Sequence, residues 1–172
     1  MPLPHLSFWR SLGASKRGSD FMRVYLVIMD ETSEALTALR FASRRAQHTG
    51  GQVHILALVP KQDFVAWGGV QATIEDEARS RAEALVANAA GTLFDEMGQR
   101  PVITVRMGDA TKEIRRYMLE CPDLAMLVLG AAASGAPGPL ITHFAGPDAG
   151  ALPCPLTIVP GGLTDADIDR MS

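Results

Sequence analysis

Apolar residues along the chain fall into short runs that are separated by longer segments with helical spacing. The runs have strand length and are rich in β-branched residues: Val24 to Met29, Val53 to Val59, Pro101 to Arg106, Leu124 to Leu129 and Pro155 to Val159. Such runs are typical of strands buried on both faces of a sheet. Between them, apolar residues recur every three or four positions, as in amphipathic helices. The pattern therefore predicts alternating strands and helices from Arg23 onward.

Residues with capping or turn preferences mark the ends of the predicted helices. The first helix follows Asp30-Glu31-Thr32-Ser33 and stops at Gly50-Gly51. The second follows a loop from Pro60 to Ala72, with Thr73 as its predicted cap, and the third runs from Gly108-Asp109 to Cys121-Pro122. Parallel neighbouring strands need long crossovers, which are right-handed. The sequence thus predicts an α/β fold, a doubly wound three-layer sandwich with a five-stranded, mostly parallel sheet.

The two ends of the chain differ from the predicted domain. Residues 1–22 carry three basic residues against Asp20, a net charge of +2, and because the whole chain carries −3, the other 150 residues carry −5. We interpret 1–22 as a flexible N-terminal extension, 23–162 as the folded domain and 163–172 as a C-terminal tail. The extension has two interpretations. It is a docking or membrane-surface arm that uses Phe8, Trp9 and Arg10, or it is a flexible extension or the product of an upstream start, with Met22 beginning the folded unit.

Composition excludes several classes of protein. A chain of 172 residues with 47% hydrophobic residues can form a core without disulfides or metals. The sequence pI is about 5.8 and no basic stripe is present, so nucleic acid is not expected as a partner. No apolar run approaches the roughly 20 residues of a membrane span. Cys121 and Cys154 lie in no metal or dithiol motif, which favours two buried thiols in the reducing cytoplasm.

Candidate binding residues follow the predicted strands, because parallel sheets bind ligands beyond the carboxyl ends of their strands. Asp30 could hold a ribose or a base, or it could cap the following helix. Glycines after the fourth strand would let backbone amides approach phosphate oxygens; they are Gly130, Gly135, Gly138 and Gly146. However, the prolines at 137, 139 and 147 lack amide hydrogens, and no lysine or arginine follows Gly130 before Arg170. These features count against a P-loop-like site.

The sequence predicts no catalytic residues. Ser134 lacks the glycines of a nucleophile elbow. His143 has no carboxylate or second histidine at a spacing that would orient it, so a structural role is expected. We therefore expect no enzymatic activity and no metal site.

Several segments, in order, resemble the universal stress protein family of small UspA-like domains. They are VYLVIMDETSEALTALRFA from Val24, VHILALV from Val53, GDATKEI from Gly108, DLAMLVLG from Asp123 and PCPLTIVP from Pro153. The resemblance runs from about Arg23 to Pro160. It implies an adenine nucleotide alpha hydrolase-like, Rossmann-like fold with strand order 3-2-1-4-5. It also implies a homodimer formed through the fifth strand.

The resemblance also implies a nucleotide site, with the pattern G-x2-G-x9-G-[ST] after strand four in members that bind ATP. Asp30, Val59 and Gly130 match the family pattern. The second glycine position is Ala133, and the closing pair falls on His143-Phe144. Starting from Gly135-x2-Gly138 leaves seven residues before Gly146, which is followed by a proline where a hydroxyl residue is expected. The usual ATP mode is therefore expected to be weakened or absent.

Two functions remain open at this point. The favoured one is a non-enzymatic stress-response protein that acts as a homodimer through contacts with an unknown protein partner, with a degenerate nucleotide loop. The alternative is an adenine-nucleotide-binding protein that takes ATP or AMP and at most hydrolyses it slowly. A flavin or electron-transfer domain is a weaker third possibility, since fold does not fix function. Phe64, Val65 and Trp67 would serve either function as a lid or partner surface, or would pack on a helix.

Overall fold

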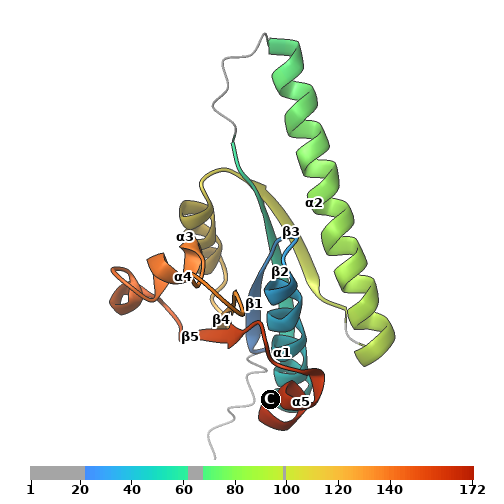
Figure 1. Ribbon diagram of the computed structural model, residues 1–172, viewed down its shortest axis with the longest axis vertical. Helices are drawn as coiled ribbons and strands as arrows, with labels where there is room; N and C mark the ends of the chain where they lie inside the picture. Colours follow the sequence, from blue (N-terminus) through green and yellow to red (C-terminus); the bar gives the residue numbers. More distant parts are fainter. Residues whose placement is uncertain (1–21, 62–67, 99) are drawn as a thin grey trace, which may run out of the picture.

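Five parallel strands form one sheet at the centre of the molecule (Figure 1). The structure, a computed structural model, describes residues 22–61, 68–98 and 100–172. The strands are β1 (Val24–Met29), β2 (Gln52–Val59), β3 (Val102–Met107), β4 (Leu124–Ala131) and β5 (Leu156–Pro160). Their order is β3-β2-β1-β4-β5, and every neighbouring pair is parallel. The predicted fold class and strand order are confirmed.

Strand β1 lies in the middle of the sheet because its six residues are apolar on both faces. All six are buried, and successive side chains point to opposite sides. Tyr25, Val27 and Met29 contribute to one apolar core, whereas Leu26 and Ile28 contribute to the other. The sheet therefore separates two cores, as a three-layer sandwich requires.

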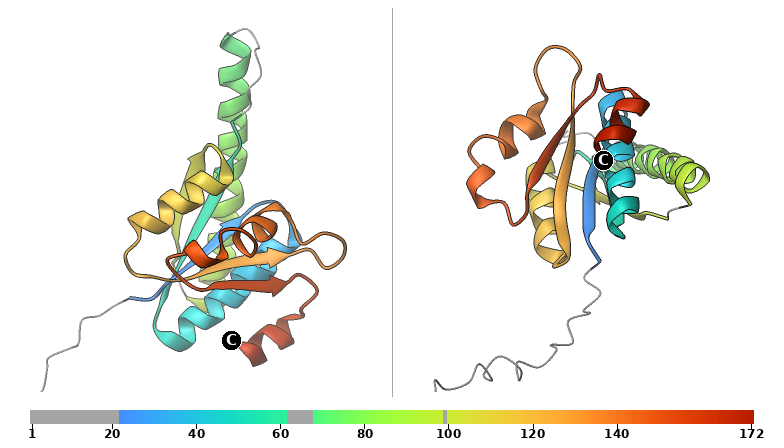
Figure 2. Two further views of the ribbon diagram at one scale, coloured as in Figure 1. Left: turned by 90° about the vertical axis from the view of Figure 1, so that its left-hand side faces the viewer. Right: turned by 90° about the horizontal axis from the view of Figure 1, so that it is seen from below.

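Helices cover both faces of the sheet. Helices α1 (Ser33–Thr49) and α2 (Gly68–Met97) pack on the first core, and α3 (Ala110–Glu120) and α4 (Pro139–Phe144) pack on the second. The two groups lie on opposite sides of the sheet in Figure 1, and the view from below in Figure 2 shows the same layers. A short turn of 3₁₀ helix, η1 (Ala149–Ala151), precedes β5.

Helix α2 begins earlier than the sequence predicts. It starts at Gly68, so Thr73 lies inside the helix and the predicted cap at that position is wrong. Capping preference is a local signal, and a residue of the capping type does not by itself fix where a helix begins. The amino-terminal part of α2 projects beyond the end of the sheet (Figure 1).

The last residues form a helix that packs on α1. This helix, α5 (Asp165–Met171), begins with a capping box between Thr164 and Asp167 and buries Ile168. Its acidic side chains pair with arginines of α1: Arg40 with Asp165 at 3.2 Å and Arg44 with Asp169 at 2.7 Å. The sequence pattern predicts only a C-terminal tail here, and the helix is an addition to that prediction.

The structure does not test the predictions for the N-terminal extension and for the loop after β2. The extension before Met22 and the apolar residues Phe64, Val65 and Trp67 lie outside the described residues. Within the described part of the chain, no helix combines the length and apolar character that a membrane span requires.

Candidate functional site

The candidate site lies where the carboxyl ends of β1 and β4 meet, because the chain order of the sheet reverses between these two strands. A crevice of about 190 Å³ opens there. Its walls come from the end of β1, the first turn of α1, the end of β4 and the start of α4. The residues that line it are Ile28, Asp30, Thr32, Glu34, Ala35, Leu129, Gly130, Pro137, Gly138, Pro139, Leu140 and Ile141.

A second pocket of about 240 Å³ lies beside the crevice, between the ends of β1 and β2 and helix α2. Asp30 lines both pockets, and Val59 and Arg81 line the second. The structure therefore brings together four of the sequence-predicted positions, with Gly130 and Gly138 on one side of Asp30 and Val59 on the other.

The remaining predicted positions lie elsewhere. Ala133, Gly135 and Gly146 are not among the described residues that line either pocket. Gly135 has a backbone φ of 84°, in the left-handed region that favours glycine. At Gly146, an added Cβ would lie 2.5 Å from the carbonyl oxygen of Thr142. Turn geometry and close packing explain these two glycines without a ligand.

Gly130 lines the crevice, but its lack of a side chain has a packing reason. A Cβ at this position would lie 2.1 Å from the carbonyl oxygen of Glu34 in the first turn of α1. Contacts under 3.0 Å are essentially never made by real Cβ atoms. The glycine is therefore needed for α1 to pass close to the end of β4, whether or not a phosphate binds there.

Asp30 supports the start of α1 through its neighbour Thr32. Its Oδ1 accepts hydrogen bonds from the backbone N–H of Thr32 at 3.0 Å and from the Thr32 hydroxyl at 2.5 Å. Thr32 is the N-cap, since its Oγ1 accepts from the backbone N–H of Ala35 at 3.3 Å. The helix cap that the sequence offered for Asp30 thus belongs to Thr32, and Asp30 holds the capping residue in place.

The crevice has the wrong electrostatics for a chain of phosphates. Two carboxylates, Asp30 and Glu34, line it, and no lysine, arginine or histidine is among its described lining residues. Pro137 and Pro139 supply walls without amide hydrogens. In the neighbouring pocket Arg81 is the basic lining residue, and it faces a set that includes Asp30 and Glu31. The arrangement favours neutral or cationic groups in the crevice over anionic ones.

The structure corrects the prediction for His143. Its Nε2 lies 2.6 Å from Oδ2 of Asp148, so a carboxylate five residues later does face the ring. The guanidinium of Arg115 on α3 pairs with the same carboxylate. Asp148 lies in the turn after α4, and this turn folds back toward the helix. A helical spacing of three or four residues therefore could not predict the contact. None of the three residues lines the crevice, so the cluster ties α4 to α3 and carries no evident chemistry.

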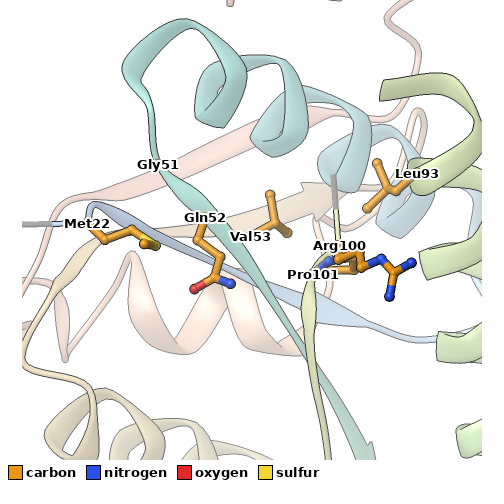
Figure 3. A pocket seen from close by; sticks show the side chains of 7 residues that line it. All are labelled: Met22, Gly51, Gln52, Val53, Leu93, Arg100 and Pro101. Carbon is orange, nitrogen blue, oxygen red and sulfur yellow. The ribbon is translucent and has the colours of Figure 1, made fainter. Parts of the chain in front are cut away.

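A further pocket of about 190 Å³ lies at the amino ends of the strands (Figure 3). It is lined by Met22, Gly51, Gln52, Val53, Leu93, Arg100 and Pro101. A Cβ at Gly51 would lie 2.5 Å from the carbonyl oxygen of Arg23, which explains this glycine by close packing. The pocket lies at the end of the sheet opposite Asp30, where α/β sheets do not usually bind ligands. Among the described residues, no group of His, Cys, Asp and Glu is arranged to hold a metal ion.

A doubly wound sheet in the order 3-2-1-4-5, with its crevice between strands one and four, defines a Rossmann-like α/β domain. The model of the universal stress protein family matches residues 22–160, and the chain belongs to that family. No curated protein matches the sequence significantly.

Solved structures of low sequence identity share the fold. The universal stress protein UspA from Lactobacillus plantarum is 16% identical, with a TM-score of 0.68 over 80% of this chain and 97% of its own. A universal stress protein family member from Burkholderia pseudomallei is 16% identical, with a TM-score of 0.64 over 81% and 97% of the two chains. An Arabidopsis thaliana family member, solved with AMP bound, is 12% identical, with a TM-score of 0.50 over 80% and 91%.

Proposed function

We propose that this chain is a non-enzymatic regulatory member of the universal stress protein family that acts as a homodimer through contacts with other proteins. In this proposal the crevice between β1 and β4 is a degenerate form of the nucleotide site. The observation that carries the proposal is the lining of the crevice, which has two carboxylates, two prolines and no basic side chain among its described residues.

The physical argument concerns the cost of placing phosphates in that crevice. Phosphate oxygens removed from water need donors, and an unsatisfied charged group in a partly desolvated site costs several kcal/mol. The carboxylates of Asp30 and Glu34 would repel the phosphate groups, where basic side chains would attract them. A bound triphosphate would therefore require rearrangement of the segment from Gly130 to Gly146.

A specific observation favours an alternative, an adenine-nucleotide-binding protein that takes ATP or AMP. The second pocket holds apolar residues beside Asp30 and Val59, as a base and ribose would need, and Arg81 offers one positive charge. The Arabidopsis thaliana relative was solved with AMP bound, which supports this alternative. AMP requires fewer phosphate contacts than ATP, so it is the better candidate for this alternative.

Direct binding measurements separate the two functions. We expect calorimetry on ligand-free protein to show no heat of binding with ATP at about millimolar concentration. Chromatography should find no nucleotide released from the denatured protein. Micromolar binding of ATP that is lost in Asp30→Ala would overturn the proposal, and binding of AMP alone would assign the second pocket to the nucleoside. Asp76→Ala, on an exposed part of α2, is the control for a general charge effect.

A further inference from the structure

The crevice between β1 and β4 combines apolar walls with two carboxylates. Its apolar lining includes Ile28, Leu129 and Ile141, and all three of these side chains are buried. The carboxylates belong to Asp30, which is exposed, and to Glu34, which is half-buried. A ligand in this crevice would therefore meet apolar surface along its length and negative charge at positions that solvent also reaches.

The backbone and neighbouring hydroxyl groups hold both carboxylates in place. Thr32 donates two hydrogen bonds to Asp30, and both go to Oδ1, so Oδ2 can accept from a ligand. The backbone of Glu34 packs directly on Gly130, and the hydroxyl of Ser33 donates to its Oε2 at 3.3 Å. Groups that are already positioned lose less conformational entropy when a ligand binds.

The charge of the crevice favours a cation. No lysine, arginine or histidine is among the described residues that line it, and Arg81 lines the neighbouring pocket instead. The amino end of α1 carries a partial positive charge of about +0.5, which is smaller than the combined charge of the two carboxylates. The crevice therefore remains negative and attracts a positively charged group.

The size of the crevice favours one long side chain over a whole cofactor. Its volume of about 190 Å³ is below the roughly 300–1,000 Å³ of typical small-molecule pockets. Lysine and arginine side chains have an aliphatic stem that packs on apolar surface and a charged end that stays near water. Their chemistry therefore matches both the apolar walls and the carboxylates of the crevice.

We propose that the crevice receives a lysine or arginine side chain of a partner protein, with its stem on the apolar walls and its cationic end hydrogen-bonded to Asp30 and Glu34. This inference rests on the proposed function, because it names the kind of partner with which a non-enzymatic family member makes contact. Hydrogen bonds between a cation and carboxylates are about twice as strong as neutral ones. A single anchor side chain seated in a pocket often dominates the binding energy of a protein interface.

NMR titration of the natural chain with capped tripeptides tests the proposal without any variant. The peptides have glycine at both ends and lysine, arginine, norleucine or glutamate in the middle. We expect the lysine and arginine peptides to shift the amide signals of residues 28–35 and 129–141, with dissociation constants of about 0.1–10 mM. The norleucine peptide keeps an aliphatic stem without the charge, so it should bind about tenfold more weakly, and the glutamate peptide should not bind.

A matched pair of substitutions tests the role of the carboxylate on α1. Glu34→Gln should weaken binding of the lysine peptide by about three- to tenfold, because one charge-assisted hydrogen bond is lost. The control Glu31→Gln removes the same charge from a residue that lines the neighbouring pocket but not the crevice. It should change the dissociation constant by less than about twofold, since an exposed charge outside the site is screened by salt.

Three outcomes would overturn the proposal. The norleucine peptide could bind as tightly as the lysine peptide, or the two glutamate variants could have equal effects. Spermidine, a free polyamine, could bind where neither basic peptide does, and the occupant would then be a small amine. If neither the peptides nor ATP binds, this inference alone fails, whereas micromolar binding of ATP would overturn the proposed function as well.

Discussion

Two glycines, one in the last residues of β4 and one directly after β5, show how closely α1 packs against the sheet. Gly130 and Gly161 both face the first turn of α1, where added Cβ atoms would lie 2.1 Å and 2.9 Å from atoms of Glu34. Glu34 is thereby held at the crevice, where its carboxylate opposes anionic ligands. The same glycine that the family pattern assigns to phosphate binding thus positions an acidic residue beside the site.

A pair of glycine substitutions measures this packing. We expect Gly130→Ala to lower the free energy of unfolding by at least about 1–3 kcal/mol, because the new methyl group overlaps the backbone of Glu34. The control Gly91→Ala lies in α2 with no atom within 4 Å, and it should raise the free energy of unfolding by about 0.5–1 kcal/mol. Urea denaturation gives both values. Equal effects of the two substitutions would show that close packing is not the reason for Gly130.

At the scale of elements, the strands were predictable from the sequence because each is a continuous apolar run. β1 was recognised because all six of its residues are buried, which removes the alternation of a half-exposed strand. Helix α4, with six residues, and α5, with seven, are too short to show a helical period. The Thr164 to Asp167 spacing of the capping box was the available signal for α5.

The charge of the site depends on residues that are far apart in the sequence, and no local sequence pattern shows that they lie close together. Asp30 was predicted because strand ends meet at one edge of a parallel sheet. Val59 was implied by the resemblance to the family pattern. Glu34 was missed because it faces the crevice only through the close packing of α1 on Gly130. Arg81 was missed because the sequence does not show which residues of α2 lie over the ends of β1 and β2.

Helix α5 is expected to contribute to stability mainly through one side chain. Ile168 is 1% exposed, so Ile168→Ala should lower the free energy of unfolding by about 2–5 kcal/mol. Met171 in the same helix is 48% exposed, and Met171→Ala should change the free energy by less than about 0.5 kcal/mol. Thermal unfolding followed by circular dichroism compares the two variants. A small effect of Ile168→Ala would mean that α5 is held by its ion pairs with α1 instead.

At the scale of the whole molecule, the sheet has two edges, and both expose apolar side chains. On β3, Val102 and Ile103 are 37% and 41% exposed, and on β5, Ile158 is 41% exposed. Edge strands with unpaired backbone groups can pair with another chain. The homodimer that we propose uses β5, which would leave β3 as the free edge of the assembled sheet.

Matched substitutions on the two edges test this arrangement. We expect light scattering at about micromolar protein to give the mass of a dimer for the natural chain. Ile158→Lys should give a monomer, because two-fold symmetry brings the β5 edges of both copies together and places like charges near each other. Ile103→Lys carries the same change to an equally exposed position on β3, so it should remain a dimer.

Comparing the masses of the two variants shows which edge strand, β5 or β3, forms the interface. A monomeric natural chain would contradict the dimer, and a dimer that only Ile103→Lys disrupts would move the interface to β3. Because the two isoleucines have the same exposed fraction, a general loss of solubility would affect both variants alike. Disruption by Ile158→Lys alone therefore identifies β5 as the strand that joins the two copies.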